Sequence, residues 1–140
     1  MSGEGLISVR FPRSLLGVFR AGISRVGVDL HTGARYLISG LQNLTPDELI
    51  AIPEPAQELD NPRVSLYVGW ALMDILAEFC QKTHLSTSSI MRRLIYGLFI
   101  QRSIRFVQHS GNKEWRLVSV QNNDENTAFK RIGEKNRAAS

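Results

Sequence analysis

The chain has 140 residues, of which 43% are hydrophobic and 21% are charged. This length suggests one compact unit or two very small ones, and the composition excludes wholesale disorder and collagen-like or low-complexity classes. We find no run of about 20 apolar residues for a membrane span, and the first residues lack the basic start and apolar core of a signal peptide. The single cysteine, Cys80, excludes a disulfide framework and a cysteine zinc site, so we expect a reducing, cytoplasmic setting.

The formal net charge is +4, from 17 basic and 13 acidic residues. Most of the bases are arginine, which suits bidentate recognition of phosphate and guanine better than lysine does. The charge is uneven, because residues 1–60 are net acidic whereas residues 61–105 and 106–140 are net basic. Nucleic acid is therefore the first partner class to consider, although many basic proteins bind none.

A gapless internal repeat aligns residues 7–44 with residues 64–101. Seven of the aligned pairs are identical in this sequence, where ordinary composition would give roughly 2. Five of these seven identities fall in one heptapeptide, Arg-x-Leu-Ile-x-Gly-Leu, at residues 35–41 and again at residues 92–98. The chain therefore contains two copies of one small unit.

Each copy opens with alternating residues, at 7–11 and again at 64–68, and Pro12 and Gly69 end these runs. A period of two predicts a half-buried strand. The residues predicted to face inward are Ile7, Val9, Phe11, Val64, Leu66 and Val68. The residues predicted to face outward are Leu6, Ser8, Arg10, Arg63, Ser65 and Tyr67.

A helical period follows each strand, starting at Leu15 in the first copy and at Leu72 in the second. The pattern breaks at Gly27 and His84, residue types that suit the left-handed position after a helix. Cys80 falls on the apolar face of the second of these helices, so we expect it in the core.

Asp29 and Ser86 are good N-caps for a second helix in each copy, and this helix carries the shared heptapeptide. Its glycines, Gly40 and Gly97, predict close helix packing between the two copies, because glycine inside a helix otherwise costs about 1 kcal/mol. One copy alone is too small to bury its apolar face and leaves an unpaired strand edge. We therefore predict a mainly α fold in which the two strands pair as an antiparallel ribbon.

The remaining segments lie between and after the copies. Residues 45–62 form an acidic linker with four prolines, in which Thr45-Pro46-Asp47-Glu48 predicts a short helix ending near Ile52. Residues 105–121 alternate weakly around a turn signal at residues 110–112, which is compatible with a β-hairpin. Residues 122–140 are polar, and we expect them to be disordered.

The order of strand, helix, turn and helix resembles the ribbon-helix-helix (Arc/MetJ-type) DNA-binding family. Residues 74–100 carry the better match, because Ser86-x-Ser88-x-Ile90-x-Arg92-x-Leu94 is similar to the opening of the family's second helix. The first copy lacks this serine pair. Two units in one chain, at residues 6–44 and 63–104, resemble the tandem pseudo-dimers among accessory proteins of conjugative-plasmid relaxosomes.

This resemblance implies a two-stranded ribbon that enters the major groove of double-stranded DNA. The residues on the outer face implied to contact bases are Ser8, Arg10, Arg63, Ser65 and Tyr67. The residues implied to contact phosphates, mostly at the second-helix N-termini, are Arg13, His31, Thr32, Ser86, Thr87 and Ser88. The alternative for each is a solvated surface that binds nothing.

Further expectations concern charge and symmetry. The outward residues of the two strands differ, which favours an asymmetric DNA site, with drift of one strand as the alternative. We place the acidic linker away from DNA, because its carboxylates would repel phosphate. Arg92 and Arg93 are predicted on exposed helix faces, and Arg35 and Arg92 are candidates to pair with nearby acids.

Nothing in the sequence indicates catalysis. His31, His84 and His109 lack metal-ligand spacing, and no phosphate loop, nucleotide-binding glycine motif or nucleophile elbow is present. We expect no enzyme activity, no metal and no cofactor. The first hypothesis is a sequence-specific DNA-binding protein, either an accessory factor in plasmid DNA transfer or a transcription regulator, with a relaxase and adjacent copies of itself as candidate partners. The alternative is a protein-interaction module that has kept the fold and lost DNA binding.

Overall fold

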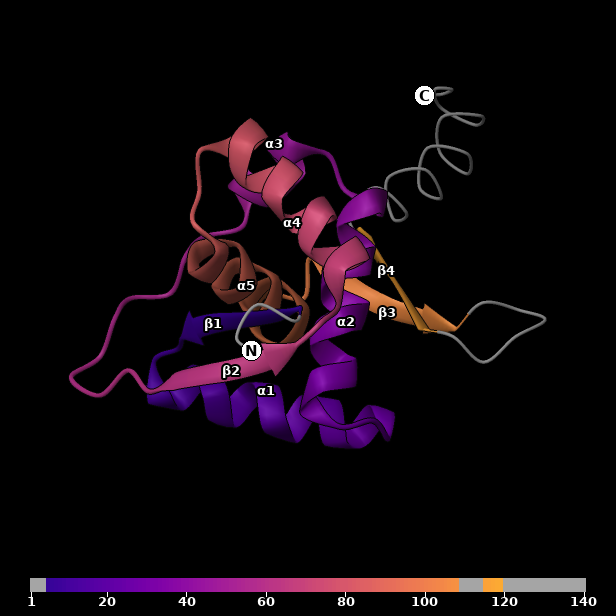
Figure 1. The fold of residues 1–140 in the computed structure, drawn as a ribbon. Coiled ribbons are helices and arrows are strands. Elements are labelled where there is room, and N and C mark those ends of the chain that lie inside the picture. The colour runs from indigo at the N-terminus through magenta and orange to yellow at the C-terminus, as the bar shows by residue number, and fades with distance from the viewer. Residues whose placement is uncertain (1–4, 109–114, 120–140) are drawn as a thin grey trace, which may run out of the picture.

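The computed structural model describes residues 5–108 and 115–119 and is mainly helical, with two small antiparallel sheets (Figure 1). In chain order the elements are β1 (Leu6–Arg10), α1 (Arg13–Val26), α2 (Leu30–Gly40), the 3-10 turn η1 (Leu41–Asn43), α3 (Pro46–Ala51), β2 (Arg63–Tyr67), α4 (Trp70–Thr83), α5 (Thr87–Tyr96), the π-helical turn η2 (Gly97–Gln101), β3 (Ile104–Gln108) and β4 (Trp115–Ser119).

The elements of the first unit (residues 6–44) recur in the second unit (residues 63–104) at the positions that the sequence repeat aligns. The bounds of β1 align with those of β2, the bounds of α1 align with those of α4, and the first residue of α2 aligns with the first residue of α5. The turn between the helices also repeats, since Gly27 and His84 both adopt left-handed backbone conformations, with φ of 87° and 61°. The predicted strand, helix, turn and helix of each copy are thus confirmed.

Both second helices begin at the predicted caps. The Asp29 side chain accepts a hydrogen bond from the Thr32 backbone N–H, and Ser86 accepts one from Ser89. The bonds from Thr32 lower the pKa of Asp29, because they stabilise its charged form. These caps satisfy N–H groups that have no partner within the helix.

β1 and β2 pair antiparallel along their whole length. Ser8 lies opposite Ser65 at the centre of the ribbon, and these are two residues that the repeat aligns with each other. Ile7, Val9 and Leu66 are buried. All six residues predicted to face outward are exposed.

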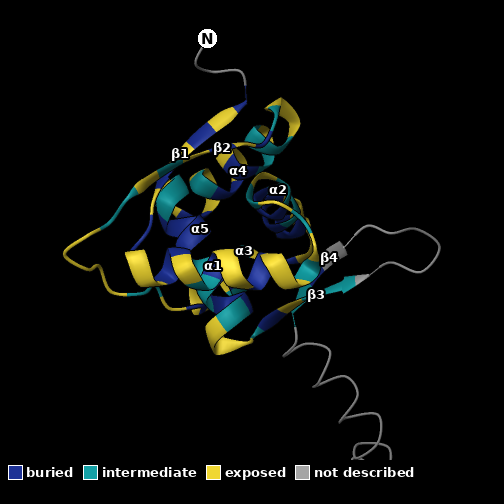
Figure 2. Cartoon of the chain, turned by 90° about the horizontal axis from the view of Figure 1, so that it is seen from below, coloured by how far each residue is buried: buried dark blue, intermediate teal, exposed yellow. Residues whose placement is uncertain are grey.

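One hydrophobic core joins the two units, the linker and the second hairpin. Large fully buried residues come from both units, such as Phe19 and Leu37 in the first and Ile90 and Leu94 in the second. Figure 2 shows the exposed positions lying along the outer surfaces of the helices, with buried positions turned towards the centre. Cys80 is only partly buried, where it packs against this core and its Sγ contacts Thr87 Oγ1 at 3.7 Å.

The linker contains the predicted short helix. Thr45 and Glu48 form a capping box at the start of α3, and the helix ends at Ile52 as its C-cap. Leu49 and Ile52 are buried, so the linker contributes apolar side chains to the core.

The predicted second hairpin is confirmed, because β3 and β4 pair antiparallel. Its predicted turn at residues 110–112 and the tail at residues 122–140 lie outside the described residues. β4 packs against α2, where Leu117 is fully buried and its carbonyl accepts a hydrogen bond from Asn43.

The predicted role of the two shared glycines is wrong. A Cβ on Gly40 would lie 2.2 Å from the Cβ of Leu117, and one on Gly97 would lie 2.9 Å from Ile52. The close neighbours are therefore the second hairpin and the linker, not a helix of the other unit. Each glycine makes room for a different segment, because the chain outside the two units is not repeated.

Candidate nucleic-acid interface

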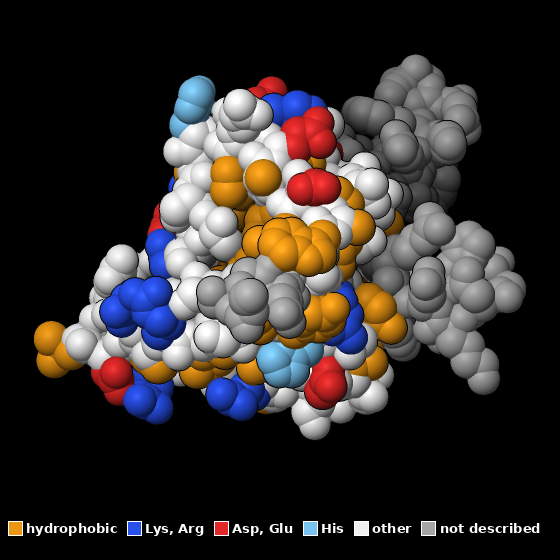
Figure 3. Space-filling model, in the orientation of Figure 1, with side chains coloured by type: hydrophobic (Ala, Val, Ile, Leu, Met, Phe, Trp, Pro, Cys, Tyr) orange, Lys and Arg blue, Asp and Glu red, His pale blue; other side chains and the backbone are white. Residues whose placement is uncertain are grey.

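The outer face of the ribbon is chemically different at its two ends. The antiparallel register places Arg10 opposite Arg63 at one end and Leu6 opposite Tyr67 at the other. Figure 3 shows basic side chains gathered over the end where β1 stops and β2 starts, and hydrophobic side chains towards the other end. The two predicted guanine-binding arginines are thus neighbours.

Each of the two arginines at the basic end makes a hydrogen bond within the protein. Arg63 Nη1 donates to Ser8 Oγ at 3.1 Å, and Arg10 Nη1 donates to the Asn61 carbonyl at 3.1 Å. A guanidinium carries five N–H donors, so each side chain keeps several for another partner. Arg63 is drawn towards the centre of the ribbon and Arg10 towards its edge.

The opposite end of the ribbon is apolar and aromatic. Leu6 is 41% exposed and Tyr67 is 50% exposed. Trp70, which the repeat aligns with Arg13, is 62% exposed at the start of α4. Trp70 is not among the residues predicted to contact DNA, although the repeat aligns it with Arg13, a predicted phosphate contact.

The start of each second helix holds the end of the other unit's strand. His31 Nδ1 accepts a hydrogen bond from the Tyr67 backbone N–H at 3.0 Å. Ser88 Oγ accepts one from the Arg10 backbone N–H at 3.3 Å. His31 and Ser88 are aligned by the repeat, as are Arg10 and Tyr67, so the two contacts correspond.

The arginines of the shared heptapeptide complete these contacts. Arg35 Nη1 donates to the Tyr67 carbonyl at 3.1 Å, and Arg92 Nη1 donates to the Arg10 carbonyl at 2.9 Å. Each strand therefore has its last N–H and its last carbonyl fixed by the other unit's second helix. These two arginines were predicted only as candidates to pair with acids, and their identity in the repeat is the sequence signal for this further role.

The predicted phosphate contacts at the second helices divide into two groups, one at each end of the ribbon. His31 and Thr32 lie beside the end of β2, and Ser86, Thr87 and Ser88 lie at the start of α5, beside the end of β1. The first backbone N–H groups of α2 and α5 have no partner inside their helices, because of helix geometry. These N–H groups and the positive end of the helix dipole favour negative charge, so the two N-termini are candidate phosphate contacts on either side of the ribbon.

Several of these side chains already have partners within the protein. Thr32 Oγ1 accepts a hydrogen bond from Arg35 at 2.8 Å, and Ser86 is the helix cap. His31 and Ser88 accept bonds from the ribbon, which leaves their own N–H and O–H groups as donors. Their side chains position the ribbon whether or not they also touch a phosphate.

The end of the acidic linker lies beside the start of α1. Asp60 pairs with Arg13 at 2.5 Å, and Glu58 accepts hydrogen bonds from the backbone N–H and the hydroxyl of Ser14. Two carboxylates thus lie beside a predicted phosphate contact, near the basic end of the ribbon. They lie there because the linker leads directly into β2, whose first residue pairs with Arg10. The bonds from Ser14 lower the pKa of Glu58 by stabilising its charged form.

The predicted exposure of Arg92 and Arg93 is also wrong, because only 9% of the Arg92 side chain and 16% of the Arg93 side chain are exposed. Arg92 pairs with Glu54 of the linker at 2.5 Å, as its predicted pairing with an acid required. Arg93 donates to the carbonyls of Ile50 and Ile52 at the end of α3. Burial raises the pKa of Glu54, but hydrogen bonds from Ser89 and Arg92 outweigh this effect and lower it overall.

No group of three or more histidine, cysteine, aspartate or glutamate side chains in residues 5–108 and 115–119 is placed to hold a metal ion. No helix within the same residues has the length and apolarity needed to span a bilayer. Comparisons of the chain with family models, with curated proteins and with solved structures found no match.

Proposed function

We propose that this protein binds double-stranded DNA by inserting the β1–β2 ribbon into the major groove, as an intramolecular pseudo-dimer of the ribbon-helix-helix type. The observation that carries the proposal is the reciprocal contact at the ribbon ends. Arg35 binds the end of β2 and Arg92 binds the end of β1, in the correspondence expected of two units related by an approximate two-fold axis. A ribbon fixed in this way presents its outer side chains rigidly, which base recognition requires.

The axis of such a pseudo-dimer would pass between Ser8 and Ser65, the pair at the centre of the ribbon. The anion-binding N-termini of α2 and α5 would then flank the groove and contact the phosphates of the two strands. Two strands side by side fit the major groove, where every base pair displays a distinct pattern of donors, acceptors and methyl groups.

The different ends of the ribbon give the proposed site a direction. Arg10 and Arg63 would favour guanine, whose O6 and N7 accept the paired donors of a guanidinium. Leu6 and Tyr67 would favour the thymine methyl group through apolar contact. Each end lies two residues from the centre, roughly 7 Å along a strand, or about two base-pair steps. The site is therefore asymmetric, with a guanine-containing half and a thymine-containing half.

The role in the cell follows from the resemblance alone. Tandem units favour an accessory factor in plasmid DNA transfer over a transcription regulator, with a relaxase or adjacent copies of the protein as partners. We place the protein in the cytoplasm and assign it no enzyme activity.

A protein-interaction module is the second candidate. The observation that favours it is the pair of carboxylates, Glu58 and Asp60, that bind Ser14 and Arg13 beside the basic end of the ribbon. These groups reduce the positive potential where a phosphate would lie.

Selection of random duplex DNA by the purified full chain, with competitor DNA at moderate salt, tests the proposal. Enrichment of an asymmetric motif with guanine on one side of the centre supports ribbon insertion with the stated direction. Enrichment of a palindrome would contradict the direction. Weak binding without enrichment, abolished by salt, would contradict sequence-specific recognition and favour the interaction module.

A further inference from the structure

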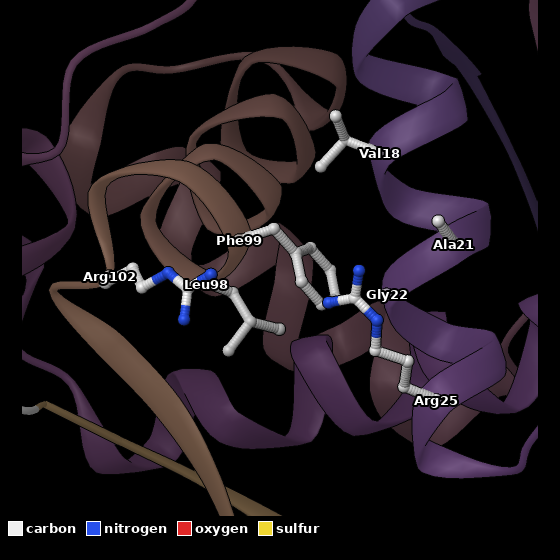
Figure 4. Close-up of a pocket in the computed structure, with 7 residues that line it drawn as sticks. All are labelled: Val18, Ala21, Gly22, Arg25, Leu98, Phe99 and Arg102. Atoms are coloured by element: carbon white, nitrogen blue, oxygen red, sulfur yellow. The ribbon is translucent and has the colours of Figure 1, made fainter.

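A pocket with a volume of about 280 Å³ lies between α1 and the segment that follows α5 (Figure 4). Its walls include Gly22 and Val18 of α1 together with Leu98 and Phe99 of η2. Among the described residues that line it, none belongs to the β1–β2 ribbon. The pocket is thus separate from the surface proposed to contact DNA.

The two units differ at aligned positions in the walls of this pocket. Gly22 stands where the second unit has Phe79, a buried aromatic residue. A Cβ on Gly22 would lie 2.1 Å from the Phe99 ring, so glycine admits the ring between α1 and η2. Phe99 therefore occupies the space that a side chain at position 22 would take, and its ring lines the pocket.

Arg25, an arginine that lines the pocket, lacks the acidic partner that the aligned residue of the second unit has. In α4, Lys82 pairs with Glu78 one turn earlier at 2.9 Å. The aligned residues of α1 are Arg25 and Ala21, both of which line the pocket. Replacement of a glutamate by alanine leaves the Arg25 guanidinium with no carboxylate in the equivalent position.

A second arginine faces the pocket from the opposite wall. Arg102 follows the π-helical turn with φ of 62°, a left-handed conformation that costs a non-glycine residue on the order of 1 kcal/mol. Figure 4 shows the Arg25 side chain reaching from α1 to the Phe99 ring and the Arg102 side chain reaching from the end of η2 towards Leu98. Within the described part of the chain, neither guanidinium has a hydrogen bond or an ion pair.

We propose that this pocket binds a small carboxylate with an aromatic or branched aliphatic body. The apolar walls of Val18, Leu98 and Phe99 suit the body, and the exposed guanidinium groups of Arg25 and Arg102 suit the carboxylate, which accepts N–H donors of a guanidinium in pairs. The volume lies at the lower limit of small-molecule sites, so the ligand is small. The inference stands independently of DNA binding, because the pocket lining contains no residue of the ribbon.

Phenylacetate is a suitable probe. Phenylacetamide is its uncharged isostere, and acetate carries the carboxylate without the aromatic ring. Titration of isotope-labelled full-length protein, followed by NMR, should shift the methyl signals of Val18 and Leu98 and the Nε–H signals of Arg25 and Arg102. Saturation with a Kd of about 1 mM or tighter is expected for phenylacetate. Phenylacetamide and acetate should bind at least about tenfold more weakly, because each lacks one of the two matched chemistries.

Three variants and a matched control decide the inference. Arg25→Gln and Arg102→Asn should each weaken phenylacetate binding about tenfold, and asparagine tolerates the left-handed backbone of position 102. Ala21→Leu should reduce binding, because Ala21 lines the pocket and a larger side chain takes up part of its volume. Arg20→Gln, an exposed α1 arginine outside this pocket, should bind as the parent protein does.

Equal binding of phenylacetate and phenylacetamide would overturn the proposal. So would parental affinity in both arginine variants, or failure to saturate below about 10 mM. The NMR spectrum of each unliganded variant reports whether it is folded, so a loss of binding is not mistaken for a loss of structure.

Discussion

Arg92 of α5 binds the backbone carbonyl of Arg10, the last residue of β1, at 2.9 Å and from a nearly buried position. It simultaneously pairs with Glu54 of the linker at 2.5 Å. One side chain therefore joins the ribbon, the second unit and the linker. The aligned Arg35 binds the Tyr67 carbonyl and has no ion pair within the described residues. The two arginines therefore make the same contact to a strand carbonyl, but only the charge of Arg92 is balanced by a carboxylate.

Arg92→Ala should lower the free energy of unfolding by about 3 kcal/mol, because it removes the two charged hydrogen bonds to Glu54 and leaves a strand carbonyl without its donor. Arg35→Ala should lower it by about 1 kcal/mol, because that side chain donates to neutral acceptors, a carbonyl and a hydroxyl. Urea unfolding measures both values, with the exposed Arg20→Ala as the control. Equal effects of the two substitutions would show that the Glu54 pair contributes little.

Arg63→Ala and Arg10→Ala should each weaken binding to the selected duplex by about 10- to 100-fold, because each removes a paired contact to guanine. Each variant should lose its preference for guanine in the guanine-containing half of the motif and keep its base preference in the other half. Fluorescence anisotropy with the selected duplex and with a duplex changed in that half measures this effect. If both variants lose the same factor on the two duplexes, the arginines contact phosphates and not bases.

The double variant Glu58→Gln/Asp60→Asn should bind duplex DNA about three- to tenfold more tightly, because it frees Arg13 and removes two charges that repel phosphate. The dependence of affinity on salt should steepen as well, since one more cation becomes available to phosphate. Asp47→Asn, an acidic residue of α3, is the matched control. Unchanged affinity and salt dependence in the double variant would place DNA away from this end of the ribbon.

Stability should fall in acid partly through Glu54. Its pKa is lowered from the usual value of 4.5, so its carboxylate contributes stability above that pH. This contribution is lost as the pH falls through the lower, folded-state pKa. Urea unfolding at about pH 7 and about pH 3 should therefore differ less in Glu54→Gln than in the parent protein. A parental pH dependence in this variant would assign the acid sensitivity to other groups.

Two glycine-to-alanine substitutions should change the free energy of unfolding in opposite directions. Gly40→Ala should destabilise the protein by about 2 kcal/mol, because its Cβ would overlap Leu117 of β4. Gly17→Ala should stabilise it by about 0.5–1 kcal/mol, because Gly17 lies in α1 with nothing within 4 Å of the added carbon among the described residues. Thermal unfolding of both variants checks the pair. Stabilisation by Gly40→Ala would mean that β4 does not pack tightly on α2.

The sequence by itself determined the local elements of both units. The alternation at residues 7–11 and 64–68 assigned the strand faces, and Gly27, His84, Asp29 and Ser86 marked the turns and caps. These features depend on residues that are close in the chain, so their periodicity and backbone preferences are legible without a structure. Because the repeat has a constant offset, the elements predicted in one unit could be compared with those predicted at the aligned positions of the other.

Only the tertiary structure decided how the units, the linker and the second hairpin meet. The burial of Arg92 depends on Glu54 of the linker, and the packing of Gly40 depends on Leu117 of the second hairpin, and both partners are distant in the chain. The pocket at Gly22 depends on Phe99 in the other unit. Such contacts follow from the path of the whole chain and from which side chains fill the same space, and no local pattern encodes them.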